Sequence, residues 1–157
     1  MFRQSKKNKS LGLLVLLGLL VEAGIFPIPQ LKSISVWAHE VEVSGDVAAT
    51  FHLEPNHNPR AGQPAIVWFA LTRRGGQIIP LEQCNCKLGV YTKGYKQGDK
   101  PLMQPPLKAI SAERYKSLPG ANIVFPKAGI YELELSGTAK NKANFKPFKL
   151  TYTVTVR

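Results

Sequence analysis

Three histidines and one pair of cysteines are the residues of this sequence whose types and spacing suit a metal site. His39 directly follows Val36-Trp37-Ala38, a small-residue pattern typical of signal-peptidase cleavage. A chain that began at His39 would offer its free amine together with the imidazole, a nitrogen chelate that suits Cu(II). His52 or His57 could supply a third nitrogen. His39 is therefore the first candidate ligand of a copper site, and the interpretation ranked ahead of such a site is three exposed histidines that bind nothing specific.

The second candidate site is the Cys84-Asn85-Cys86 sequence. In an extended strand both thiolates would project to one face, where they suit a soft ion such as Cu(I). An oxidising compartment instead favours a disulfide, which requires a bend because extended Cα atoms two residues apart are ~6.5 Å distant. We rank a local disulfide or buried thiols first and a metal site second. A redox-active pair comes third, because no helix N-terminus is expected there.

The first 38 residues have the pattern of a secretory signal peptide. A basic stretch precedes an unbroken apolar run from Leu11 to Val21. The run is shorter than the ~20 residues that a spanning helix needs. We expect a signal helix over residues 1–38 and a mature domain over residues 39–157, with cleavage after Ala23 or an uncleaved anchor as the alternatives.

The charge of the chain is basic but dispersed. Removal of residues 1–38 takes away five basic side chains and one acidic side chain, so the net charge falls from +11 to +7. The remaining basic residues are scattered, and no nucleic-acid recognition motif is present. We expect an exported protein of the periplasm, thylakoid lumen or extracellular space, with no nucleic-acid partner and no permanent membrane span after processing.

Alternating apolar and polar residues predict strands along the mature part of the chain. The clearest examples are VAATFHLE from Val47, GIYELELSG from Gly129 and FKLTYTVTV from Phe148. AIVWFALT is apolar almost throughout, so Trp68 and Phe69 are expected to fill the core. SAERYKSL, residues 111–118, is expected to form one short helical turn. Six to eight short strands without an amphipathic helix predict an all-β fold, an antiparallel β-sandwich of the immunoglobulin-like type.

Two features carry a family resemblance. FPKAGIYELELSG and the terminal TVTV resemble the proline, glycine, x, tyrosine turn into a late strand of YtkA-like and other immunoglobulin-like exported domains, including cyanobacterial ones. A histidine at the mature N-terminus of a small sandwich is similar to CopC-like periplasmic copper carriers. That resemblance implies that the amine and side chain of His39 join a second histidine around Cu(II). The later Asp-x-His pair of those carriers has no counterpart here, because no histidine follows His57.

Motifs of common enzymes are absent from the sequence. It contains no H-E-x-x-H, G-x-S-x-G, G-x-G-x-x-G or phosphate-loop pattern. A copper monooxygenase built on His39 is the one enzymatic idea that the residues permit. We expect no catalytic residue and no cofactor other than copper. The expected function is a small exported binding protein that holds copper. The alternative is a structural or interaction module that docks a protein of the cell envelope without a metal.

Overall fold

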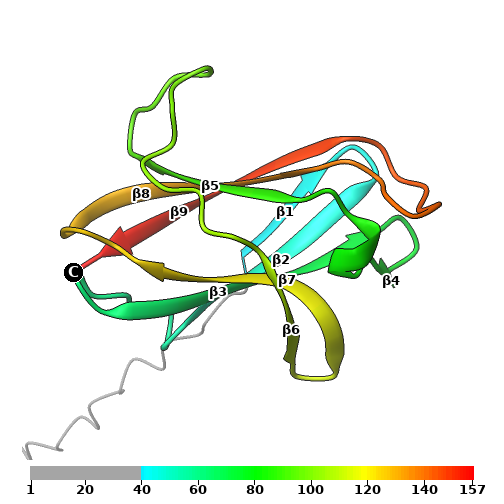
Figure 1. Ribbon diagram of the computed structural model, residues 1–157, viewed down its shortest axis with the longest axis horizontal. Coiled ribbons are helices and arrows are strands. Elements are labelled where there is room, and N and C mark those ends of the chain that lie inside the picture. Colours follow the sequence, from blue (N-terminus) through cyan, green and yellow to red (C-terminus); the bar gives the residue numbers. More distant parts are fainter. Residues whose placement is uncertain (1–39) are drawn as a thin grey trace, which may run out of the picture. The chain divides into compact units, whose positions relative to one another are not determined.

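The computed structural model describes residues 40–157, and strands dominate this range (Figure 1). The expected signal peptide, its cleavage sites and His39 lie outside the described residues. No helix of the described range is long and apolar enough to cross a membrane. The elements are β1 (Glu40–Ser44), β2 (Val47–Glu54), β3 (Pro64–Arg73), β4 (Gln77–Ile78), the 3-10 turn η1 (Leu81–Gln83), β5 (Lys87–Thr92), β6 (Lys108–Ala112), β7 (Tyr115–Val124), β8 (Gly129–Gly137) and β9 (Phe148–Val156).

The strands form two antiparallel sheets, which confirms the all-β prediction. The larger sheet has the order β1-β2-β3-β7-β6, with β4 paired to β3, and the smaller has the order β5-β8-β9. Figure 1 shows the two sheets as layers, with β8 and β9 on one side and β3 and β7 on the other. One apolar cluster takes residues from both layers. The arrangement is that of a β-sandwich.

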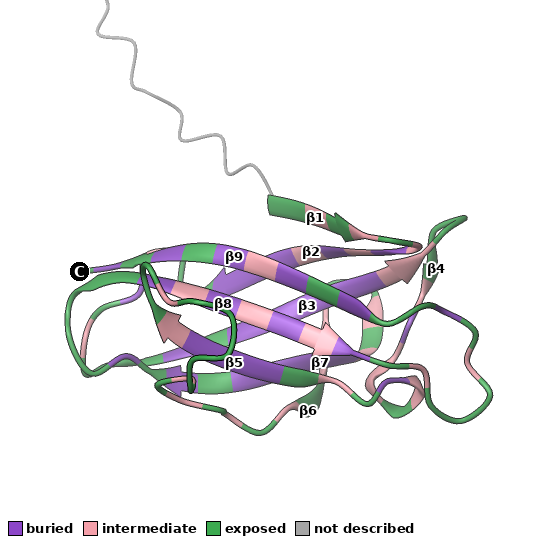
Figure 2. Cartoon of the chain, turned by 90° about the horizontal axis from the view of Figure 1, so that it is seen from above, coloured by how far each residue is buried: buried purple, intermediate pink, exposed green. Residues whose placement is uncertain are grey.

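The core follows from the two-residue period of a strand. Alternate residues of β8 and β9 are buried, which gives their striped ribbons in Figure 2, and β2 alternates from Val47 to Phe51. The inward positions predicted from the sequence are confirmed on these strands. The Tyr131 hydroxyl donates a hydrogen bond of 2.8 Å to the carbonyl of Lys127, four residues upstream.

Trp68 is buried as predicted, but it belongs to a different apolar cluster from the one between the sheets. Phe69 faces the core, and alternation therefore directs Trp68 to the outer face of the larger sheet, where it is still only 3% exposed. There it belongs to a second apolar cluster with Ala70 and Leu118. The side chains that cover this cluster come from β4 and the β6–β7 hairpin: Ile78, Ile110, Ala112 and Tyr115.

The predicted helical turn over residues 111–118 is also wrong. This segment is the tip of a hairpin, in which β6 and β7 pair and Ala112 lies opposite Tyr115. Glu113 has a φ of 53°, the left-handed conformation that reverses a chain in a tight hairpin turn. Gly120 on β7 lets the hairpin close, because a Cβ there would lie 2.9 Å from the carbonyl oxygen of Val67 and would collide with Ile110.

The outer face of the smaller sheet carries a stacked tyrosine pair. Tyr91 and Tyr95 have ring centres 3.9 Å apart. The Tyr95 hydroxyl donates a hydrogen bond of 3.0 Å to Glu134, which also forms an ion pair of 3.0 Å with Lys149. Burial and the hydrogen bond to Glu134 raise the pKa of Tyr95 to about 12. The stacked tyrosines and the hydrogen bond to Glu134 therefore hold the start of the loop between β5 and β6 against the sheet.

Tyr95 is expected to ionise late in an alkaline titration. A folded pKa above the unfolded value of ~10 means that its contribution to stability is complete below pH 10 and is lost as the pH rises through 10 to 12. The phenolate absorbance of the wild type minus that of Tyr95→Phe should increase with pH, with a midpoint near pH 12 in buffer. It should move to about 10 in concentrated urea. A difference centred near 10 in the folded protein contradicts the prediction.

Candidate functional site

His52 is positioned by the ladder between β2 and β3. It lies directly opposite Trp68, and the two rings stack with centres 3.6 Å apart and planes 6° from parallel. The sequence places His52 on the polar side of β2, yet only 9% of it is exposed. The reason is the large indole on the neighbouring strand, which covers one face of the imidazole.

His57 is brought back to His52 by the turn that follows β2. Asn56 and His57 both adopt left-handed conformations, with φ of 53° and 49°, which asparagine and histidine tolerate better than most residues. The His57 N–H donates to the Leu53 carbonyl at 2.8 Å and closes the turn. The ring of His57 then lies 6.1 Å from that of His52 and 6.0 Å, edge-on, from that of Phe51. Two of the three candidate histidines therefore share one end of the sandwich.

The spacing of the two imidazoles is close to the upper limit for a shared metal ion. A ring nitrogen binds a divalent ion such as zinc at about 2.0 Å, and the ring centre lies about 1.1 Å further, so two rings on one ion are at most ~6.3 Å apart. The observed 6.1 Å lies within that limit. Among residues 40–157, no group of three or more His, Cys, Asp or Glu side chains could hold a metal. A site here thus needs further donors from outside that range.

Trp68 and Glu54 support the histidine pair, and sequence reasoning missed this role. The indole N–H of Trp68 donates a hydrogen bond of 3.1 Å to the Glu54 carboxylate. Glu54 and His52 are two residues apart on the same face of β2, so the indole contacts both. In β3 the side chains of Val67, Phe69 and Leu71 face inward and leave Trp68 outside. The sequence gives no signal of this division, because apolar residues occupy both faces of the strand.

The edge strand β1 begins beside this pair. Glu40, the first described residue, lies opposite Phe51 in the antiparallel ladder, so His52 is the next position along β2. Glu40 and Glu42 give this edge negative charge. Burial, with repulsion from Glu42 as the smaller cause, raises the pKa of Glu40 above its usual value. Burial, again followed by the charges of Glu42 and Glu40, also raises the pKa of Tyr152, whose hydroxyl donates to the Ala49 carbonyl at 3.0 Å.

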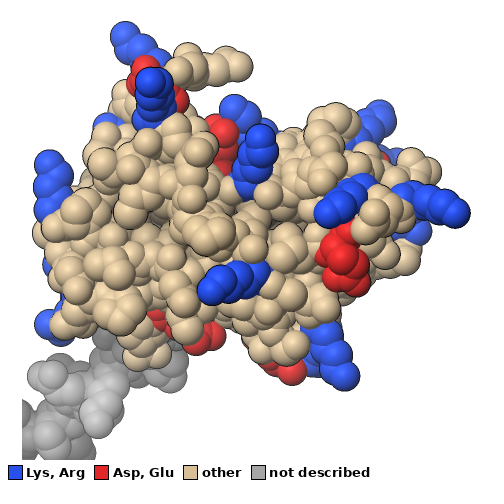
Figure 3. All heavy atoms as spheres, viewed as in Figure 1, with Lys and Arg blue, Asp and Glu red and all other residues tan. Residues whose placement is uncertain are grey.

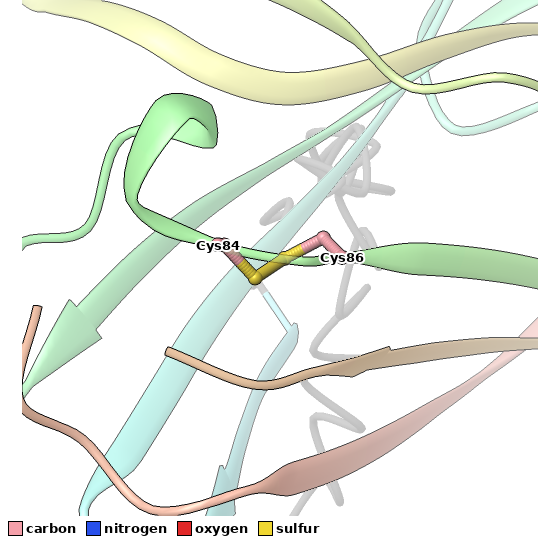
Figure 4. Close-up of a disulfide and its surroundings, with 2 residues drawn as sticks. All are labelled: Cys84 and Cys86. Atoms are coloured by element: carbon pink, nitrogen blue, oxygen red, sulfur yellow. A yellow bond between two sulfur atoms is a disulfide. The ribbon is translucent and has the colours of Figure 1, made fainter. Parts of the chain in front are cut away.

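Cys84 and Cys86 lie elsewhere and are joined to each other. They form a disulfide with Cα atoms 5.1 Å apart, on the segment between η1 and β5 (Figure 4). Cys84 packs against Gly137, which pairs with the first residue of β9. Arg157, directly after the last residue of β9, instead hydrogen-bonds to Pro59 in the loop that follows His57. Because nine strand residues span about 25 Å, the cysteines and the histidines cannot share a metal.

The charges on one face of the described structure do not form a binding stripe. On the face seen in Figure 3, Lys and Arg side chains are spread apart and interspersed with Asp and Glu. Comparison with known proteins gives no relative: no protein-family model and no curated protein matches the chain.

Proposed function

We propose that the protein is an exported binding protein that holds Cu(II) with the N-terminal amine and imidazole of a processed chain starting at His39, together with His52 and His57. In this proposal the protein binds copper and does not use it for catalysis. The observation that carries it is the 6.1 Å spacing of His52 and His57 at the end of β2 where β1 begins. Imidazole and amine nitrogens are donors that Cu(II) prefers.

Covalent connection limits how far His39 can lie from this pair. Adjacent Cα atoms are about 3.8 Å apart, and Glu40 lies opposite Phe51, the residue before His52 on β2. If the antiparallel ladder continues by one residue, His39 and His52 become direct partners, whose Cβ atoms are typically ~5 Å apart on one face. The terminal amine, the His39 ring and the two described imidazoles would then complete the donor set.

The terminal amine gives the proposal its sharpest test. Protein that begins at His39 should bind Cu(II) at least ~100-fold more tightly in calorimetric titration than protein with one additional residue before His39, because the extension turns a ligating amine into an amide. The core residues lie between Val47 and Val156, so both forms retain the whole core. The extension therefore alters the donor set and leaves the fold unchanged.

Trp68 provides a second readout of the same titration. Of the two tryptophans in the chain, Trp37 precedes the proposed start, so Trp68 is the sole tryptophan of the processed form. Its ring stacks on His52, and copper bound to that imidazole should quench its fluorescence. If the two forms of the protein bound Cu(II) with equal affinity, the terminal amine would not be a ligand. If the fluorescence of Trp68 did not change, His52 would not be a ligand.

The second candidate is an interaction module of the cell envelope that docks a protein partner. The observation in its favour is the outer face of the edge strand β1, where Val41 is 55% exposed and Val43 is 68% exposed. Apolar side chains this accessible are typical of protein-binding surfaces when they are adjacent. Purification from native envelope fractions separates the two candidates, because a copper carrier retains metal and a docking module retains a protein.

We also propose that the sandwich is of the immunoglobulin-like type. The corner hydrogen bond of Tyr131 supports it, since immunoglobulin-like domains use a tyrosine in this way. Trp68 differs from their usual tryptophan, which packs between the sheets, because Trp68 stacks on His52 on the outer face. In this protein the tryptophan therefore serves the candidate site in place of the core.

A further inference from the structure

The Cys84–Cys86 disulfide is held in a bend that the surrounding backbone builds. Cys84 ends the 3-10 turn η1 and donates its N–H to the Leu81 carbonyl at 3.1 Å. It also forms an isolated bridge with Ala139, and the Asn85 N–H donates to the Thr138 carbonyl at 2.9 Å. These bonds fix the position of both cysteines independently of the bond between their sulfurs.

A disulfide that spans one intervening residue contributes little to the stability of the fold. The stabilisation that a disulfide gives by restricting the unfolded chain grows with the length of the closed loop, and this loop is as short as a C-x-C sequence allows. The apolar core around it is extensive and takes in both sheets. A purely stabilising role is therefore a weak explanation for the pair.

The two sulfurs differ in their access to solvent. Cys84 is 4% exposed, and a Cβ added to Gly137 would lie only 2.6 Å from its sulfur. Cys86 is half-buried and lines two adjoining surface hollows of about 260 and 430 Å³, of which Cys84 borders only the larger. Three charged side chains border these hollows: Glu82, Lys87 and Lys140. The net positive charge favours the approach of an anionic thiolate.

We propose that this disulfide is a thiol–disulfide exchange site that external thiols attack at Cys86. The incoming thiolate forms a new S–S bond to the Cys86 sulfur, the Cys84–Cys86 bond breaks, and its electron pair leaves on Cys84, which takes a proton from water. A second thiolate then attacks the external sulfur of the mixed disulfide and displaces Cys86. Two external thiols are oxidised to one disulfide, and the protein gains two electrons as a dithiol.

Single-cysteine variants test which sulfur is reactive. After treatment with oxidised glutathione, the Cys86 thiol of Cys84→Ser should form a mixed disulfide at least ~10-fold faster than the Cys84 thiol of Cys86→Ser. Urea below the unfolding transition should not change the Cys86 rate, because the reaction needs no opening of the fold. Equal rates, or a Cys86 rate that rises with urea in step with unfolding, overturn the proposal.

A measurement on the wild-type protein covers the case in which a variant fails to fold. The purified protein is mixed with reduced glutathione, quenched with acid and mapped by mass spectrometry after digestion. Glutathione attached to Cys86 supports the proposal. Glutathione attached mainly to Cys84, or a disulfide that resists glutathione until the protein unfolds, contradicts it. Copper binding enters neither experiment, so their outcome is independent of the function proposed above.

Discussion

Replacing His52 with phenylalanine is expected to weaken Cu(II) binding at least ~100-fold while the protein stays folded. Loss of even an outer partner of a metal ligand commonly costs about 10- to 100-fold in affinity, so loss of a ligand should cost no less. Phenylalanine keeps an aromatic ring against Trp68, where the His52 ring centre now lies 3.6 Å away, and removes only the nitrogens. Calorimetric titration of protein that begins at His39 measures the change.

Thr50→Ala is the matched control for this substitution. Thr50 lies on the same strand and face as His52, two residues away, and carries no nitrogen ligand in its side chain. Its affinity for Cu(II) should equal that of the wild type. His57→Ala should weaken binding in the same direction as His52→Phe, because the two rings are 6.1 Å apart. Wild-type affinity in His52→Phe would show that copper, if bound, is held elsewhere.

The strands and their inward faces could be predicted from the sequence because alternation is a local property. Val47, Ala49, Phe51 and Leu53 are buried on β2 as the pattern indicated, and β8 and β9 follow the same rule. Each of these strands has one face on the core and one face toward solvent, so a two-residue period reports both. The pattern fails where both faces are covered.

Strand β3 is the case in which both faces are covered. AIVWFALT has no polar residue before Thr72 to mark a solvent face, so the sequence did not separate Trp68 from Phe69. The separation depends on the β6–β7 hairpin, whose residue Ile110 packs over Gly120 beside the indole. That hairpin was itself predicted as a helical turn, because SAERYKSL lacks the Gly or Asn that usually marks a tight hairpin.

The candidate site could be predicted in part. The sequence singled out His52 and His57, but their spacing depends on the left-handed turn at Asn56 and His57 and on the register between β2 and β3. Register is not a property of a single segment, since it depends on the partner strand. The separation of the cysteines from the histidines likewise follows from the direction of β9 across the sandwich.

The second large effect is expected at Trp68, on the stability of the fold. Truncation of a buried aromatic side chain typically costs 3–5 kcal/mol, and Trp68→Ala should fall in that range. The substitution removes the stack on His52, the hydrogen bond to Glu54 and the contacts with the outer cluster around Leu118. Urea unfolding followed by circular dichroism measures the loss, because the fluorescence of the only tryptophan in the processed form disappears with the residue.

Two further variants separate the parts of that effect. Trp68→Phe keeps a ring beside His52 but loses the indole N–H, so its cost should be about 1–2 kcal/mol, and it should retain most of the copper affinity. Ile66→Ala is the control on the same face of β3, where Ile66 is 39% exposed and should lose less than about 1 kcal/mol. If Trp68→Ala were no more destabilising than Ile66→Ala, the outer cluster would not stabilise the sheet. The support that Trp68 gives to His52 would then have to come from ring contact alone.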